Sequence, residues 1–320
     1  MLQFNLNFII MKDNLLLKQS SIKRVFLGLI SLFILGLFSA KAQVQFTQTT
    51  DADFNKGVLN NVLVGSNNVS LQFAASDVGT WLTTTVLPQT LSGHKAATWN
   101  NQYVYVVGGW NDLTYSSAVY RATIQSGGIS GWTTLASIPV ALKDAAVVIG
   151  TNTIYVIGGR DASQVYSTIY YAAINSDGSI GAWQTSAVSL PAVRWGHAAV
   201  YLNGFIYVTG GAGTLTETAA LNTVYYSKVL ADNTLGSFTT GTALTAARNK
   251  HSMITYNGVL YVLGGYANGG TKASTVYQAT PGVNGANGAW TTQTALPVTI
   301  SNHSSVVTNG LIMVMAGETG

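Results

Sequence analysis

Tyr103-Val-Tyr-Val-Val-Gly-Gly109 is the stretch that decides the fold, because variants of it return four more times. Residues 154–159 read Ile-Tyr-Val-Ile-Gly-Gly, 206–211 read Ile-Tyr-Val-Thr-Gly-Gly, 260–265 read Leu-Tyr-Val-Leu-Gly-Gly and 312–317 read Ile-Met-Val-Met-Ala-Gly. The first position of the pair therefore falls at 108, 158, 210, 264 and 316. A step of about 50 residues indicates an array of repeated structural units.

Each unit can be laid out as four short strands. In the third unit, a strand over 197–202 is followed by the turn Asn203-Gly204 and a strand over 205–210. Asn-Gly between apolar runs predicts a hairpin, because both turn residues need positive φ. The same place holds Asn257-Gly258, Asn309-Gly310, Asn100-Asn101 and Thr151-Asn152. A third strand carries a tyrosine, within Val119-Tyr120, Tyr170-Tyr171, Tyr225-Tyr226 or Val276-Tyr277. A fourth strand is marked by Trp132, Trp183, Phe238 or Trp290. No helical periodicity competes with this pattern, so we expect an all-β fold.

These marks resemble the Kelch repeat, in which a double glycine ends the second strand, a tyrosine follows and a tryptophan precedes the fourth strand. The resemblance runs from about Trp81 to the C-terminus. It implies a Kelch-type β-propeller of four-stranded antiparallel blades. Three departures are present: the aspartate common in the third strand is mostly missing, Phe238 replaces one tryptophan and Ala316 replaces one glycine.

The repeat marks are interpreted as structural. Glycine permits unusual dihedrals and the close approach of a neighbouring backbone, so the pair ends the second strand. Tryptophan is large enough to be the main contact between adjacent blades. A phosphate-binding glycine loop is rejected, because no helix signal follows any of the pairs.

The repeats divide the chain into a propeller over 69–320, preceded by a leader over 43–68 and a segment 1–42 of another kind. Complete units are expected near 94–143, 144–196, 197–250 and 251–302, with partial units at 69–93 and 303–320. Strands over 69–73 and 80–86 would be the third and fourth of the first partial unit. About five blade signatures are thus present. We expect an incomplete ring and a chain that is a fragment, while closure of the two partial units into a ring of five stays open.

Residues 1–42 are predicted to be a secretory signal peptide. Lys18, Lys23 and Arg24 precede an apolar run over 25–38, and Ala40-Lys41-Ala42 offers a small-x-small cleavage pattern. The run is short for a membrane span, so we expect a secreted or cell-surface protein without a membrane anchor. The segment holds five of the 15 Lys and Arg and one of the 11 Asp and Glu, which leaves ten of each and no net charge. Nothing in that balance favours nucleic acid or an anionic membrane as a partner.

The histidines and one loop invite a metal interpretation that the spacing does not favour. His94, His197, His251 and His303 each precede the double glycine or its replacement by 13 or 14 residues, so each belongs to a separate unit. No short-range pair of metal ligands accompanies them, and a structural role is expected. Asn175-Ser-Asp177-Gly178-Ser179 lacks the carboxylates of a calcium loop and predicts a type I turn. We therefore expect no metal and no cofactor.

Some enzymes resemble the same repeat plan. The resemblance includes copper oxidases such as galactose oxidase, whose cofactor contains a crosslinked Tyr–Cys pair, and the absence of cysteine excludes that chemistry here. Sialic acid mutarotases also resemble this repeat plan and would need Arg, Glu and aromatic groups at the channel mouth. The sequence offers only Glu217 and Glu318 as glutamates. We expect a protein that is not an enzyme, with a mutarotase-like enzyme as an alternative.

One face of the predicted propeller carries the candidate ligand-binding residues. The loops between the second and third strands and the connections between blades emerge together, and they are rich in Trp, Tyr and Arg, which anchor many binding sites. The candidates are Trp110, Asn111, Asp112, Arg160, Asp161, Arg194, Trp195, Arg248, Asn249, Tyr266 and Asn268. Arg194 and Arg248 stand three residues before a histidine, where Kelch ligand pockets often carry arginine; Leu91, Ala141 and Ile300 take that place in the other units.

We therefore expect an exported recognition module that binds a carbohydrate or a protein on this face. A purely structural repeat array within a larger surface protein is the other alternative.

Overall fold

The computed structural model describes residues 84–126, 128–308 and 310–319. The predicted signal peptide, the leader and the strand expected over 69–73 lie outside them. Residues 84–86, the described end of the strand expected over 80–86, are not in a strand. Within the described ranges every regular element is a β-strand, as predicted. No helix in this part of the chain has the length and hydropathy to cross a membrane.

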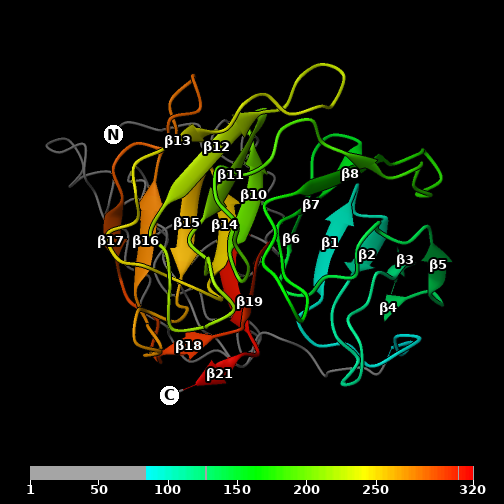
Figure 1. Cartoon of the computed structure of the whole chain (residues 1–320), viewed down its shortest axis with the longest axis horizontal. Helices are drawn as coiled ribbons and strands as arrows, with labels where there is room; N and C mark the ends of the chain where they lie inside the picture. Colours follow the sequence, from blue (N-terminus) through cyan, green and yellow to red (C-terminus); the bar gives the residue numbers. More distant parts are fainter. Residues whose placement is uncertain (1–83, 127, 309, 320) are drawn as a thin grey trace, which may run out of the picture. The chain divides into compact units, whose positions relative to one another are not determined.

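Four antiparallel blades follow one another along the chain (Figure 1). Blade 1 contains β1 (Lys95–Trp99), β2 (Tyr103–Val107), β3 (Val119–Gln125) and β5 (Thr133–Leu135), with the short β4 (Gly128–Ile129) beside the end of β3. Blade 2 contains β6 (Ala146–Ile149), β7 (Thr153–Ile157), β8 (Ile169–Ala173) and β9 (Gln184–Thr185). Blade 3 contains β10 (Ala198–Leu202), β11 (Phe205–Thr209), β12 (Val224–Lys228) and β13 (Thr239–Thr240). Blade 4 contains β14 (Ser252–Tyr256), β15 (Val259–Leu263), β16 (Val276–Ala279) and β17 (Thr291–Gln293).

A further hairpin follows blade 4. It pairs β19 (Ser304–Thr308) with β20 (Leu311–Met315), while β18 (Ile300–Ser301) pairs with β21 (Glu318–Thr319). The first strands β1, β6, β10, β14 and β19 contact each other in that order. They are therefore the inner strands of the propeller.

The hairpin turns follow from residue type. Asn203, Asn257, Asn100 and Asn101 all have positive φ, as the sequence predicts. Thr151 and Asn152 do not, so the prediction of the same turn in blade 2 is wrong. β-branched Thr151 does not favour the left-handed region. The blade 2 hairpin is instead closed without left-handed residues, by Gly150 N donating to Thr153 O at 2.9 Å.

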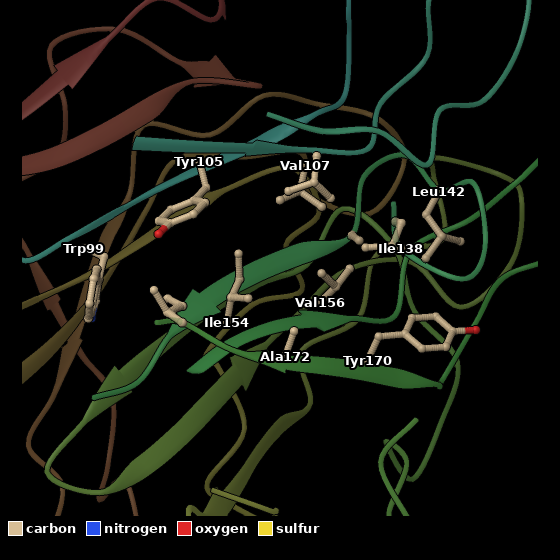
Figure 2. Close-up of a cluster of buried hydrophobic side chains, with 12 residues drawn as sticks. Trp99, Tyr105, Val107, Ile138, Leu142, Ile154, Val156, Tyr170 and Ala172 are labelled. Atoms are coloured by element: carbon tan, nitrogen blue, oxygen red, sulfur yellow. The ribbon is translucent and has the colours of Figure 1, made fainter. Parts of the chain in front are cut away.

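The core lies between blades. One buried cluster joins Trp99, Tyr105 and Val107 of blade 1 to Ile154 and Val156 of blade 2, as Figure 2 shows. Similar clusters join blade 2 to blade 3 and blade 3 to blade 4. The central tyrosine of each second strand is buried, and each blade is stabilised by apolar surface that it shares with the next.

The repeated tryptophans lie at the outer edge of these interfaces, which corrects the expectation that they are the main contact. Trp132 and Trp183 are only partly buried, whereas Trp290 is 9% exposed. Each indole donates to a carbonyl near the fourth strand of the preceding unit: Trp132 to Thr85 O, Trp183 to Ala136 O and Trp290 to Thr242 O. The tryptophan thus covers the outer edge of the interface, and strand residues fill its interior.

Candidate ligand-binding face

The loops between second and third strands and the connections between blades form one hydrogen-bonded surface, which we call the 2–3 face. Its loops cover 108–118, 158–168, 210–223 and 264–275, and its connections cover 136–145, 186–197, 241–251 and 294–303. The second glycine of each pair donates to a connection: Gly109 to Leu142 O, Gly159 to Arg194 O, Gly211 to Arg248 O and Gly265 to Ile300 O, at 2.7 to 2.9 Å. The double glycine therefore fixes the connection against the loop, as predicted for a close backbone approach.

This pattern corrects the alignment of the second unit. Leu142, and not Ala141, takes the position of Arg194 and Arg248. Ala145 then takes the position of the histidines, since its Cβ lies against Gly159 as the Cβ of His197 lies against Gly211. The expected alignment of the second unit was one residue off because blade 2 has no histidine to mark the position.

A chain of left-handed residues runs along the inner rim of this face. Gly93, Asp144, Gly196, Lys250 and Asn302 have φ between 52° and 62°. Each amide donates to the carbonyl of the previous one: Asp144 to Gly93, Gly196 to Asp144, Lys250 to Gly196 and Asn302 to Lys250, at 2.6 to 3.0 Å. Four of the five are Gly, Asp or Asn, which tolerate this conformation, and Lys250 is the exception. This recurrence is the signal that sequence reasoning missed. The rim presents the side chains of Asp144, Lys250 and Asn302.

Cations and aromatic rings alternate along the rim and beside it. Lys143 lies 5.1 Å from the ring centroid of Trp110, and Arg160 lies 4.1 Å from that of Trp195. Lys250 lies 5.6 Å from the ring centroid of Trp195 and 5.8 Å from that of Tyr266. These are cation–π distances, so the rings hold the cations in place.

Four of the predicted ligand residues are buried, which corrects the expectation that they are exposed. Arg194, Trp195 and Asn249 have no exposed surface and Arg248 is 4% exposed. Arg194 donates from Nη1 to Gly210 O at 2.8 Å and from Nη2 to Thr223 Oγ1 at 3.1 Å. Burial lowers the pKa of Arg194 to about 10, which keeps it charged at neutral pH.

Arg248 has the same structural role in the next blade. Its Nη2 donates to Thr275 Oγ1 at 2.5 Å and to Tyr277 Oη at 3.2 Å, and the guanidinium lies over the Tyr277 ring. Both arginines therefore tie a connection to the 2–3 loop and third strand behind it. These partners lie 16 to 29 residues away in sequence, so residue type alone did not reveal the burial.

The loop of blade 3 covers the other two buried candidates. Trp195 Nε1 donates to Thr214 O at 2.6 Å, and Asn249 Nδ2 donates to Glu217 O at 3.2 Å. Glu217 Oε1 also pairs with Lys250 Nζ at 2.7 Å. Glu217 is thus part of this face although the sequence analysis did not assign it here.

The remaining candidates lie on the surface of the 2–3 face. Asp112 and Asn268 are exposed, and Trp110, Asn111, Arg160, Asp161 and Tyr266 are partly buried. Some of them shape their loops. Burial alone would raise the pKa of Asp161, but hydrogen bonds from Tyr166, Ser163 and Gln164 lower it to about 2. Asn111 Oδ1 accepts from Thr114 N at 2.8 Å in the same manner.

The histidines pack between successive double glycines, as a structural role requires. Cβ of His197 lies against Gly211 of its own blade, while its Cε1 lies against Gly158 of the blade before. His251 and His303 repeat this arrangement. In the part of the chain that the structure describes, no group of three or more His, Asp or Glu is placed to hold a metal ion. The loop over 175–179 is a turn closed by Gly178 N donating to Asn175 O at 2.9 Å, as predicted.

Charge is concentrated on the 2–3 face. Only four described charged residues lie elsewhere: Arg121, Asp177, Lys228 and Asp232. The rest lie in its loops and connections, with two exceptions: Lys95 is the first residue of β1, and Glu318 lies in β21. Glu318 still adjoins the face, because its carboxylate accepts hydrogen bonds from Tyr266 Oη and Asn302 Nδ2, each at 2.7 Å. Since only 8% of the chain is charged, this gathering distinguishes the face from the remaining surface.

The double-glycine strands, the inter-blade tryptophans and the four-stranded blades define a Kelch-type β-propeller. Residues 93–317 match the family model described as "KLHDC2/KLHL20/DRC7 Kelch-repeats domain", and the chain belongs to this family.

Individual relatives are more distant. Beta-scruin and alpha-scruin of Limulus polyphemus are each 29% identical to this chain, over 136 and 134 residues. The match covers 41% of this chain and 14% of either scruin. The solved structure of YjhT superposes with a TM-score of 0.58 at 17% identity, over 72% of this chain and 74% of that one, which shows a shared fold.

Proposed function

We propose that this Kelch propeller is an exported recognition module that binds a protein ligand through its 2–3 face and performs no catalysis. The observation that carries the proposal is the concentration of charge on this one face of a chain that is otherwise poor in charge. Charges of both signs at a rim steer a protein partner and select against wrong ones.

The aromatic residues support the same proposal. Trp110 and Tyr266 are partly buried, so each presents a ring at the surface beside Lys143 or Lys250. Aromatic rings held rigidly by neighbours provide contact area with little loss of conformational freedom. Asp112 and Asn268 at the loop tips are free to add polar contacts. Such groups can also bind a carbohydrate, which is the second candidate class of ligand.

A charge-reversal experiment tests the proposal. Lys143→Glu combined with Lys272→Glu reverses two cations of the 2–3 face, and the control Lys228→Glu reverses one cation on the exposed end of β12. Extracellular proteins of the source cell are captured on immobilised wild-type protein and both variants, and a glycan array is probed in parallel.

We expect a partner that wild-type protein and Lys228→Glu retain and that the double variant loses. Equal capture by all three proteins would remove the 2–3 face as the site. Binding to glycans alone, lost in the double variant, would replace the protein ligand by a carbohydrate.

A further inference from the structure

A hollow of about 300 Å³ opens between blade 2 and blade 3, on the side opposite to the 2–3 face. Blade 2 contributes Thr153, Tyr171 and Gln184, from β7, β8 and β9. The loop before β13 of blade 3 contributes Asp232 and Asn233. The volume is at the small end of the range for sites that bind small molecules.

The hollow exists because blade 2 lacks an aromatic ring that blades 1 and 3 possess. Tyr103, Thr153 and Phe205 are the equivalent first residues of β2, β7 and β11. The Tyr103 ring packs against Gly178 of the following blade, and the Phe205 ring packs against Gly285. Thr153 is too small to fill the same space.

The facing loop changes together with this residue. Asn233 takes the place of Gly178 and Gly285 and keeps the same left-handed conformation, with φ of 63°. A side chain is possible there because no ring presses against it. Two interfaces thus pair a ring with a glycine, whereas this interface pairs Thr153 with Asn233, and both of these residues line the hollow.

The lining has the chemistry of a site for a neutral polyol. It presents one carboxylate, from Asp232, the amides of Gln184 and Asn233, and the ring of Tyr171, with no cation among its residues. Asp232 Oδ1 accepts from Thr234 N at 3.0 Å and from Thr234 Oγ1 at 2.7 Å, which orients the carboxylate. Tyr171 Oη donates to Gln184 Oε1 at 3.2 Å, which directs the Gln184 amide nitrogen away from this bond.

We propose that this hollow binds one neutral sugar residue, separately from the ligand of the 2–3 face. The Asp232 carboxylate and the side-chain amides hydrogen-bond to sugar hydroxyls, and Tyr171 contacts the apolar face of the pyranose ring. An anionic sugar is disfavoured, because Asp232 repels it and the lining holds no cation to offset that charge.

The test uses the methyl glycosides of neutral hexoses and N-acetylhexosamines as probes, with the methyl glycoside of sialic acid as the anionic comparison. Backbone amide NMR shifts are measured at millimolar sugar. We expect a neutral glycoside to shift Thr153, Gln184 and Asp232 with saturation, and the anionic one to shift none of them. Absence of binding by every neutral probe would overturn the proposal.

A filling variant uses the arrangement that blade 1 already has. Thr153→Tyr combined with Asn233→Gly rebuilds the pair that Tyr103 and Gly178 make. We expect Kd to rise at least tenfold with no fall in Tm, because a ring replaces empty space. An unchanged Kd in this variant would also overturn the proposal.

A surface variant provides a second test in case the filling variant does not fold. Gln184 and Thr291 are exposed residues of the fourth strands of blades 2 and 4. Gln184→Ala should weaken sugar binding several-fold, while Thr291→Ala should leave it unchanged. Equal affinity in both variants contradicts the proposed site, and neither result bears on ligand capture by the 2–3 face.

Discussion

A Cβ atom placed on Gly158 would lie 2.7 Å from the carbonyl oxygen of Arg194, a residue of the next inter-blade connection. Gly158 has φ of 57°, and Gly159 N donates to the same oxygen at 2.9 Å. The glycine pair therefore sets the distance between a blade and the connection that carries the chain onward. Three more blade units repeat this relationship, through Leu142, Arg248 and Ile300.

Gly158→Val should lower the free energy of unfolding by about 1 to 3 kcal/mol, because it adds backbone strain and a clash with Arg194 O. Chemical denaturation checks this. Gly204→Val is the matched control: Gly204 also has positive φ, but nothing lies within 4 Å of an added Cβ. A Gly158→Val protein as stable as Gly204→Val would show that the close approach is unimportant.

Tyr105→Phe should cost about 1 kcal/mol of stability, since the buried Tyr105 hydroxyl donates to Gly178 O of the next blade at 2.8 Å. Tyr207 is the equivalent residue of blade 3, and its hydroxyl is buried with no hydrogen-bond partner among the described residues. Tyr207→Phe should therefore be neutral or stabilising. Equal losses in the two variants, measured by urea unfolding, would argue against the inter-blade hydrogen bond.

Acid should destabilise the propeller through its buried histidines. Burial, with His303 and Arg248 nearby, lowers the pKa of His251 to about 3, and burial lowers that of His303 to about 4. The unfolded chain binds these protons at about pH 6.5, before the folded chain does. Stability is thus complete above pH 6.5 and falls as pH drops from there toward 4, by about 1.4 kcal/mol per unit for each such group.

The variant His251→Gln should show a shallower loss of stability between pH 6.5 and pH 4 than wild type. Its amide can replace the contact between His251 Nε2 and Thr209 Oγ1, which are 2.8 Å apart. Urea midpoints at several pH values measure the slope. Parallel curves for both proteins would mean that His251 is not the titrating group.

Glu217→Gln should loosen the loop over 213–219 without unfolding the protein. The Glu217–Lys250 pair is partly exposed, so its loss should cost at most about 1 kcal/mol. Amide hydrogen exchange should accelerate in the loop and stay unchanged in β11. Protection equal to wild type would indicate that the bonds from Trp195 and Asn249 suffice to hold the loop.

The sequence predicted most of the scaffold because its signals are local. Asn203-Gly204 specifies a hairpin by its own dihedral preferences, and the second strands are apolar because neighbouring blades bury them on both sides. Where a local signal was missing the prediction failed, as with Ala145, which stands in place of a histidine.

The site was predicted less well because burial of a loop residue depends on distant partners. Arg194 and Trp195 have the residue types of a binding site, but Thr223 and Thr214 turn them into structural contacts. The rim of left-handed residues needs alignment of all units at a position that the double glycine does not mark. The small size of Thr153 becomes informative only when it is compared with Tyr103 and Phe205, which occupy the equivalent position in other blades.

Site-specific photocrosslinking tests most directly whether the 2–3 face is where this propeller meets its ligand. A photoreactive amino acid replaces Asn268 or Asp112, both exposed on the 2–3 face, or Val283, which is fully exposed in the loop before β17. Crosslinked partners are then identified by mass spectrometry. We predict a common partner at positions 268 and 112 and none at 283. The same partner captured from position 283, with none from the other two, would contradict the proposed function.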